Sequence, residues 1–236
     1  MKIEVLADVE AVARRAAEII AGEARAAVKG RGRFVVAVSG GRTPWAMLRA
    51  LSSLDVPWDS VHVVQVDERI APAGHTDRNL THLRESLLLQ GRPVPAHIHP
   101  MPVESADLDE AAHRYAQTLV EIAGSPPVLD LVHLGLGPDG HTASLVPGDP
   151  VLDVTGADVA VTGVYQGRRR MTLTYPVLNR ARRVLWLITG DDKAAMLVRL
   201  SRADPAIPAG RVMQDDAVIL ADRAAAQQQA AARPIE

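Results

Sequence analysis

Residues 34–66 read FVVAVSGGRTPWAMLRALSSLDVPWDSVHVVQV, and this stretch decides the fold class. Its two ends, 34–39 and 61–66, are short apolar runs of the kind that form strands buried on both faces. Between them, 45–54 carries apolar residues at helical spacing. A strand, a helix and a second strand in this order predict two parallel strands joined by a helical crossover.

The same alternation continues on both sides of this unit. Upstream, apolar positions from Val9 onward follow helical spacing, Asp8 is suited to cap that helix, and 30–32 end it. Downstream, further strands are predicted at 128–134, 183–189 and 218–222, and further helices at 78–89, 108–123 and 192–200. Strands that alternate with helices predict an α/β fold with a mainly parallel, Rossmann-like sheet and helices on both of its faces.

Composition is that of an ordinary globular protein, with 47% apolar and 23% charged residues in a chain of 236. Aromatic residues make up only 3%, so the core must consist of Val, Leu, Ile and Ala. Because neither a repeat nor a long linker interrupts the chain, we expect residues 1–236 to form one domain. The biased tail AAAQQQAAARPIE (224–236) is expected to be a last helix that frays.

Charge and cysteine content exclude several classes of function. The net charge of -2 gives no general attraction for nucleic acid or for an anionic membrane surface, so any anion site must be local. The absence of cysteine excludes disulfides, thiolate metal ligands and cysteine nucleophiles. The first residues lack the apolar region of a signal peptide, and no apolar run approaches membrane-spanning length, so we expect a cytoplasmic protein.

A glycine pattern typical of dinucleotide binding, G-x-G-x-x-G, occurs in LGLGPDGHTASL (134–145). A dinucleotide site also needs a long helix directly after the glycines and, about 20 residues further on, an acid for the ribose. The prolines of 147–150 leave room for little more than one helical turn, and Asp158 opens another strand-like run with no helix before it. The nucleotide interpretation is therefore rejected, and Asp139 and His141 of this loop need another explanation.

In an open parallel sheet the ligand site lies beyond the carboxyl ends of the strands, so the residues that follow each strand are the candidates. The first strand runs into SGGRTP (39–44) and then into a helix. Gly40 and Gly41 let backbone N–H groups approach a ligand, Thr43 can cap the helix, and Arg42 adds positive charge. This segment is either a phosphate site or an ordinary tight turn between a strand and a helix.

Charged residues follow the second strand. The sequence DER (67–69) places Asp67 and Arg69 at the mouth of the same sheet, where such charges are either solvated or functional. Asp77 is expected to cap the next helix, which contains Asn79 and brings its amide towards the same cleft. Two neighbouring strand ends therefore offer polar groups to one edge of the sheet.

Two later strand ends supply a histidine and a lysine. His141 follows a glycine-rich turn, where Asp139 and backbone N–H groups can fix its tautomer or its charge. Lys193 stands in the first turn of a helix, where a lysine opposes the helix dipole unless an anion is bound or the neighbouring acids offset it. Three arginines, 168–170, precede a Thr-rich strand, and such a cluster is typical of a solvated sheet edge.

Taken together, these segments resemble the 6-phosphogluconolactonase family, in the superfamily that it shares with glucosamine-6-phosphate isomerases. The matching segments lie in the family's order from residue 39 to about 197: SGGRTP, VDERIAP with HTDRN, LGLGPDGHTASLVPG, RRMTLTYPVLNRA and ITGDDKAAML. The third of them is the specific one. The resemblance implies an α/β fold that hydrolyses the lactone of 6-phosphogluconate in the oxidative pentose phosphate pathway, without a metal or another cofactor.

The resemblance also implies roles for particular residues. His141 would be the general base. The sugar-phosphate lactone would bind to the SGG loop and to three basic side chains, Arg69, Arg169 and Lys193. Two positions depart from the family's pattern, since Arg42 and Arg78 each stand where serine is common. The first adds charge to an anion site, and the second leaves the role of its turn open.

Hydrolysis of a lactone needs a base for the water, a group that stabilises the oxyanion and an acid for the leaving oxygen, and one histidine can be both base and acid. Arg69 or the glycine N–H groups of 135–140 can meet the oxyanion. The isomerase relatives carry an acid five residues after this histidine, where Val146 stands here, which disfavours aldose–ketose isomerisation or deamination. A non-catalytic sugar-phosphate sensor is the other alternative, but the residues before the first strand predict one amphipathic helix rather than a helix-turn-helix.

Overall fold

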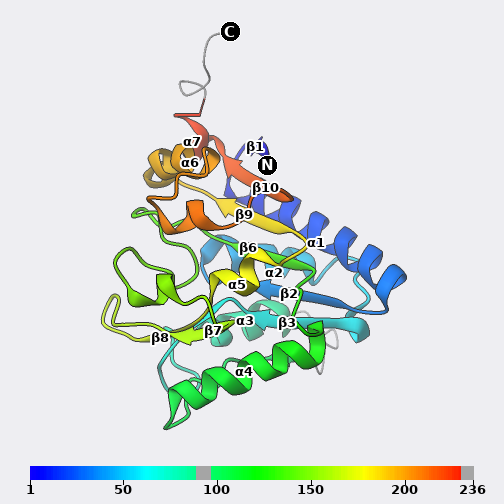
Figure 1. The fold of residues 1–236 in the computed structure, drawn as a ribbon. Coiled ribbons are helices and arrows are strands. Elements are labelled where there is room, and N and C mark those ends of the chain that lie inside the picture. The colour runs from blue at the N-terminus through cyan, green and yellow to red at the C-terminus, as the bar shows by residue number, and fades with distance from the viewer. Residues whose placement is uncertain (89–96, 230–236) are drawn as a thin grey trace.

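The computed structural model describes residues 1–88 and 97–229 and centres on a seven-stranded sheet (Figure 1). Its strands lie in the order β1-β10-β9-β6-β2-β3-β5, and neighbouring strands are parallel. Their bounds are β1 Lys2–Leu6, β2 Phe34–Val38, β3 Val61–Gln65, β5 Ile98–His99, β6 Leu131–Leu134, β9 Val184–Ile188 and β10 Ala217–Asp222. The predicted parallel α/β sheet is confirmed.

Helices cover both faces of this sheet, as predicted. On one face lie α1 Val9–Arg31, α2 Arg42–Leu51 and α3 Asn79–Leu88, which share one apolar core cluster. On the other lie α4 Leu108–Ala123, α5 Tyr175–Asn179, α6 Ala194–Ser201 and α7 Arg223–Ala226, which pack in a second cluster. Short 3-10 helices occur in the connections: η1 Trp58–Ser60, η2 Pro150–Asp153, η3 Asp191–Lys193 and η4 Pro208–Arg211.

Strand β2 shows how one apolar run supplies both cores. Val36 and Val38 pack in the cluster with α1 and α2, whereas Val35 and Ala37 pack in the cluster with α4. Successive side chains of a strand point to opposite faces, so all five residues of β2 are buried. The carboxyl end of this buried strand delivers SGGRTP to the edge of the sheet.

A second sheet continues from the carboxyl end of β3; two of its strands fall in runs that the sequence marked as strand-like, but their pairing with 67–69 was not predicted. It is antiparallel and consists of β4 Asp67–Arg69, β8 Arg170–Leu173 and β7 Val159–Val161 in the order β4-β8-β7. Three charged residues show no apolar periodicity, so DER was expected only to follow a strand. Pairing of β4 with β8 places Arg170 directly opposite Arg69.

Short edge strands and several boundaries also differ from the prediction. β1 and β5 lie at the two edges of the large sheet and pair on one side only, so they need no continuous apolar run. Helix α2 begins three residues before its predicted start, and 191–193 form η3 instead of the first turn of α6. Of the predicted tail helix, α7 reaches Ala226, and 230–236 lie outside the described residues.

Within the described part of the chain, no helix has the length and apolar character needed to cross a membrane.

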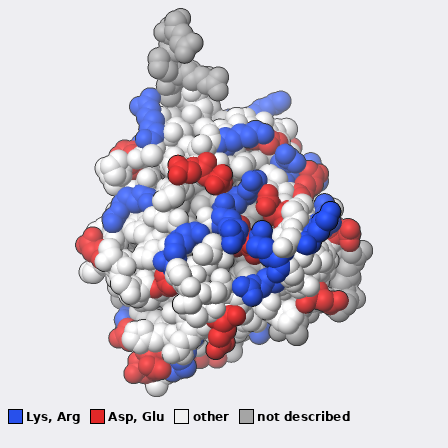
Figure 2. All heavy atoms as spheres, turned by 45° about the vertical axis from the view of Figure 1, so that its right-hand side comes forward, with Lys and Arg blue, Asp and Glu red and all other residues white. Residues whose placement is uncertain are grey.

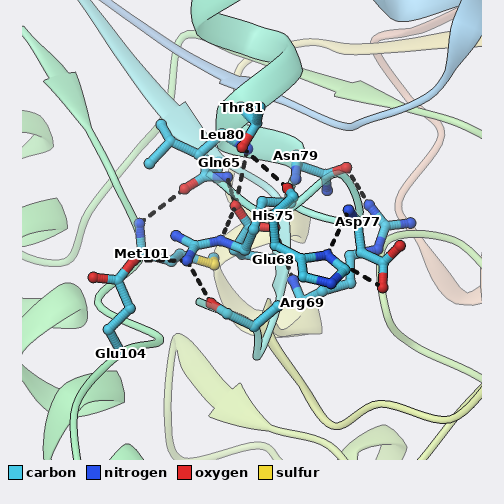
Figure 3. A network of polar contacts seen from close by, with 12 residues as sticks. Gln65, Glu68, Arg69, His75, Asp77, Asn79, Leu80, Thr81, Met101 and Glu104 are labelled. Carbon is cyan, nitrogen blue, oxygen red and sulfur yellow. Dashed lines mark hydrogen bonds and ion pairs between the residues drawn. The ribbon is translucent and has the colours of Figure 1, made fainter. Parts of the chain in front are cut away.

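A buried carboxylate, Glu68, anchors the start of α3 (Figure 3). It accepts hydrogen bonds from the backbone N–H groups of Asn79 at 2.8 Å and Leu80 at 2.9 Å, which stabilises the helix N-terminus. The Arg78 side chain is buried, and its Nε lies 3.0 Å from Glu68 Oε2. At position 78, where serine is common in the family that the sequence resembles, this chain therefore has an arginine in a buried ion pair.

The prediction that Asp77 caps α3 is wrong. Its carboxylate instead accepts a hydrogen bond from Arg168 Nε at 2.6 Å. The Arg168 hydrogen bond holds the pKa of Asp77 below its usual value. Glu68 reaches the free N–H groups of α3 from β4, eleven residues earlier in the chain, and no local sequence pattern reveals such a contact.

Candidate active site

A hollow of about 650 Å³, here called the pocket, lies at the carboxyl ends of β2, β6 and β9. Most of the predicted site residues line it: Gly40, Gly41, Arg42, Thr43, Asp67, Arg69, His141 and Lys193. The other three, Asp139, Asn79 and Arg169, do not line it and are described below. Among the described residues, no group of three or more His, Asp and Glu side chains is arranged to hold a metal ion.

The loop after β2 brings the start of α2 to the pocket. Gly41, with a φ of 130°, stands directly before the helix in a backbone conformation that favours glycine. No side chain of the described residues caps this N-terminus, which leaves N–H groups of the first turn for an anion. Thr43, which was expected to cap, lies inside the helix, and its hydroxyl bonds that of Thr189 at 2.9 Å instead.

Asn79 lies behind the pocket. Its Nδ2 donates to the backbone oxygen of Asp67 at 3.0 Å, and its Oδ1 accepts a hydrogen bond from the Arg69 guanidinium. A Cβ atom on Gly40 would overlap the Asn79 amide, so this position requires glycine. Asn79 therefore orients Arg69, and it lines a neighbouring hollow of about 270 Å³ that also contains Arg69.

Arg69 and Arg170 stand side by side in the pocket wall. They are directly paired residues of β4 and β8, and both line the pocket. Arg170 is only 5% exposed, and burial, together with the nearby charge of Arg69, lowers its pKa. Like charges directly opposite each other destabilise a sheet, whereas a bound anion offsets their repulsion. This pair favours an anionic ligand, and sequence reasoning missed Arg170.

Arg169, which was predicted to bind the substrate, lies outside the pocket. Its Nε donates to the backbone oxygen of Thr162 at 3.2 Å, and its side chain lines a different surface hollow beside the start of α4. Neighbouring residues of an extended chain point to opposite sides, so only one of two successive arginines can face the pocket. The placement of Arg169 in the cleft is therefore corrected to Arg170.

His141 and Asp139 form a hydrogen-bonded pair. His141 Nδ1 lies 2.5 Å from Asp139 Oδ1, and the same oxygen accepts the His141 backbone N–H at 3.1 Å. Partial burial opposes ionisation of Asp139, but these hydrogen bonds outweigh it and hold the pKa of Asp139 below its usual value. The ionised carboxylate holds the ring proton on Nδ1, which leaves Nε2 of His141 free to accept a proton.

The loop that carries Asp139 and His141 leaves little space between its backbone and the imidazole ring. Gly137 donates its N–H to the backbone oxygen of His141 at 2.8 Å, and a Cβ atom on Gly137 would overlap the imidazole ring. Further along, the hydroxyl of Ser144 donates to Asp67 at 2.6 Å in a buried contact that ties the loop to β4. The glycine pattern that resembles a nucleotide motif therefore makes room for the histidine.

Lys193 reaches the pocket from η3, which follows β9. Its Nζ lies 2.8 Å from a carboxylate oxygen of Asp192, so a neighbouring acid does offset its charge. Within the described residues, no side chain caps η3 or the start of α6. The Lys193 side chain is partly exposed and lines the pocket, where an anion can compete with Asp192 for it.

A buried histidine supports the loop after β2. His133 of β6 is inaccessible to solvent, and its Nδ1 accepts a hydrogen bond from the Ser39 N–H at 3.2 Å. Burial lowers the pKa of His133 to about 3. The folded protein therefore keeps His133 neutral down to a pH at which an unfolded histidine is already protonated.

We expect the free energy of unfolding to fall as the pH drops below about 6.5, because the unfolded chain then binds a proton that folded His133 does not. This stability is fully present above about pH 6.5, and its loss approaches about 1.4 kcal/mol per pH unit for one proton. His133→Asn keeps an acceptor for Ser39 and should show a smaller slope than the unmodified protein. Urea unfolding at several pH values measures both slopes, and equal slopes would contradict the assignment.

The presence of Lys and Arg side chains at the surface is not enough to identify the pocket. Figure 2 shows Lys and Arg side chains gathered on one face of the molecule, with Asp and Glu side chains among them. Arg31 and Arg182, near the amino ends of the strands, both contact Asp130, at 2.6 and 3.5 Å. In the pocket, by contrast, Arg69 and Arg170 occupy directly opposite positions of β4 and β8, so two positive charges stand close together, with Asp67 as a nearby acid. The pocket differs from the rest of the basic surface because two of its arginines lie opposite each other.

The chain matches known proteins over most of its length. The family model described as Glucosamine-6-phosphate isomerases/6-phosphogluconolactonase matches residues 7–220. A 6-phosphogluconolactonase of Synechocystis sp. is 37% identical over 210 residues, which cover 86% of this chain and 87% of the relative. A 6-phosphogluconolactonase of Mycobacterium tuberculosis is 37% identical over 238 aligned residues, which cover 95% of this chain and 96% of the relative.

Solved structures show the same fold. The 6-phosphogluconolactonase of Trypanosoma brucei superposes with a TM-score of 0.83 at 25% identity, over 96% of this chain and 98% of that one. The Thermotoga maritima 6-phosphogluconolactonase gives a TM-score of 0.81 at 26% identity, over 94% of this chain and 98% of that one. With the family model matching nearly the whole chain, this protein belongs to the family of glucosamine-6-phosphate isomerases and 6-phosphogluconolactonases.

Proposed function

We propose that this chain hydrolyses 6-phospho-D-glucono-1,5-lactone to 6-phospho-D-gluconate, a step of the oxidative pentose phosphate pathway. One observation carries the proposal: the Asp139–His141 pair stands at a pocket whose other walls present Arg69, Arg170 and Lys193. A proton acceptor beside a group of cations suits an ester-like substrate that carries a phosphate. The names of the relatives described above support the same reaction.

His141 acts as the general base in this proposal. Its Nε2 takes a proton from water while the water oxygen bonds to the lactone carbonyl carbon, which forms a tetrahedral oxyanion. As the oxyanion collapses, the bond from this carbon to the ring oxygen breaks, and His141 returns the proton to that oxygen. Asp139 holds the ring in position and stabilises the imidazolium that forms between these two steps.

The phosphate of the substrate binds among the cationic groups. Arg69 and Arg170 can share it, because they stand opposite each other in β4 and β8. Lys193 and the uncapped N-terminus of α2 reach the same pocket and add further donors. Arg42, at the first position of α2, increases the positive charge there.

Two features weigh against the alternative functions. Val146, at the position where the isomerase relatives carry an acid, is buried and apolar, so it supplies no second proton-transfer group. Residues 1–33 contain β1 and the single long helix α1, which packs against the sheet, so these residues do not form a helix-turn-helix. The lack of a nucleic-acid partner and the cytoplasmic location stay predictions from the sequence.

The experiment that tests the proposal offers the protein two substrates in parallel. We expect the protein to accelerate loss of freshly generated 6-phosphogluconolactone and to leave glucosamine 6-phosphate unchanged under the same conditions. Release of ammonia from the amino sugar, with no acceleration of lactone loss, would favour the deaminase alternative instead.

A further inference from the structure

The hairpin between β7 and β8 places a tyrosine beside the Asp139–His141 pair. Its loop is Gln166 and Gly167, which take φ values of 50° and 78°. Tyr165 and Arg168 flank this loop and exchange backbone hydrogen bonds at 2.9 and 3.2 Å. Two central residues with positive φ are the mark of a tight hairpin turn, which holds the flanking residues in fixed directions.

Tyr165 makes three contacts from this position. Its hydroxyl donates to Asp139 Oδ2 at 3.3 Å. Its ring meets the His141 ring edge-on, with 5.5 Å between the ring centres. The Arg170 guanidinium carbon lies 5.0 Å from the centre of the same ring, within range of a cation–π contact. One side chain therefore touches the proposed base, its carboxylate partner and an arginine of the pocket wall.

We infer that Tyr165 is a positioning residue that fixes the Asp139 carboxylate through its second oxygen and thereby sets the orientation and basicity of His141. Asp139 Oδ1 serves the ring and backbone of His141, and Oδ2 serves the Tyr165 hydroxyl, so the carboxylate is held at both ends. Burial and the nearby Asp139 charge raise the pKa of Tyr165, so its hydroxyl stays a donor at neutral pH. The inference rests on the proposed role of His141 as base.

The direction of the effect follows from the charge on Asp139. A donated hydrogen bond stabilises the ionised carboxylate, so removal of the Tyr165 hydroxyl makes Asp139 more basic. A more basic Asp139 holds the Nδ1 proton more strongly and favours the protonated ring of His141 over the neutral ring that accepts the water proton. Tyr165→Phe removes none of the other charged groups that line the pocket, which are Arg42, Asp67, Arg69, Arg170, Asp192 and Lys193.

Tyr165→Phe tests the inference, because it keeps the ring and removes only the hydroxyl. We expect kcat on 6-phosphogluconolactone to fall about 3- to 10-fold, the size of one hydrogen bond, with KM changed less than about twofold. The acid limb of the kcat/KM profile should move to higher pH by about 0.3 to 1 unit. Thermal unfolding should change little, because the lost hydrogen bond to Asp139 lies in a solvent-exposed contact.

Three comparison variants make the outcome decisive. Tyr175→Phe removes a buried hydroxyl that bonds the Pro208 carbonyl at 2.9 Å, and it should lower stability without moving the acid limb. In an Asp139→Asn background, Tyr165→Phe should cost less than about twofold, because the charged acceptor is gone. His141→Ala tests the base separately: if it is inactive while Tyr165→Phe leaves the limb unmoved, only the inference about Tyr165 fails. An unmoved limb, or an undiminished cost in the Asp139→Asn background, overturns the inference.

Discussion

Replacement of His141 by alanine is expected to lower kcat on 6-phosphogluconolactone by roughly 10²- to 10⁴-fold, the usual contribution of a positioned general base. The reason is geometric. His141 Nδ1 is committed to Asp139 at 2.5 Å, so Nε2 is the atom left to accept the water proton. Without the ring, water must attack unassisted, and only binding and the oxyanion contacts still favour the reaction. Steady-state kinetics on purified protein measure the loss.

His113→Ala is the matched control for this variant. His113 lies exposed on α4, away from the pocket, so its removal should leave kcat unchanged. Asp139→Asn should lower kcat less than His141→Ala does, because Asp139 orients the base and does not itself accept the water proton. A folded His141→Ala variant with near-normal kcat would remove His141 from the chemistry.

Lys193→Ala should separate recognition of the phosphate from the chemistry. A charge-assisted hydrogen bond to phosphate is worth roughly 1.5 to 3 kcal/mol, so loss of one should lower kcat/KM on the phosphorylated lactone by about one to two powers of ten. Unphosphorylated gluconolactone never makes this contact, so its slow hydrolysis should change little. The comparison of kcat/KM for the two lactones, each with and without Lys193, measures the difference.

The control for this variant is Lys29→Ala. Lys29 stands in the last turn of α1, outside the pocket, and its loss should affect neither substrate. An equal fall of Lys193→Ala on both lactones would mean that Lys193 serves the fold or the reacting centre. The phosphate assignment would then be wrong.

The main elements of the fold could be predicted because their apolar patterns are long. The first helix, predicted from Val9 with Asp8 as its cap, runs over Val9–Arg31, and the Asp8 side chain accepts the Ala11 N–H at 2.8 Å. Buried strands such as β2 and β9 show as unbroken apolar runs. The edge strands and β4 could not be predicted in this way, because a short strand that is exposed or charged lacks such a run. The strand-like runs of β7 and β8 are visible in the sequence, but their pairing with β4 is not.

The site could be predicted as far as it depends on which residues follow a strand. Strand ends of a parallel sheet meet at one edge, and this rule alone brings SGGRTP, Asp67, His141 and Lys193 together. This rule could not predict the contacts that residues make across the second sheet. Arg170 could not be told from Arg169 without the pairing of β8 with β4, and the sequence did not single out Tyr165 because the contact joins residues 26 apart.

The most direct test of the central claim is the rate at which 6-phosphogluconolactone disappears. Freshly generated lactone is mixed with increasing amounts of the folded protein, and the first-order loss is compared with spontaneous hydrolysis in the same buffer. We predict a rate that rises in proportion to the protein concentration and far exceeds the spontaneous one. A folded protein that leaves the lactone to decay at the spontaneous rate, at every concentration, would contradict the account.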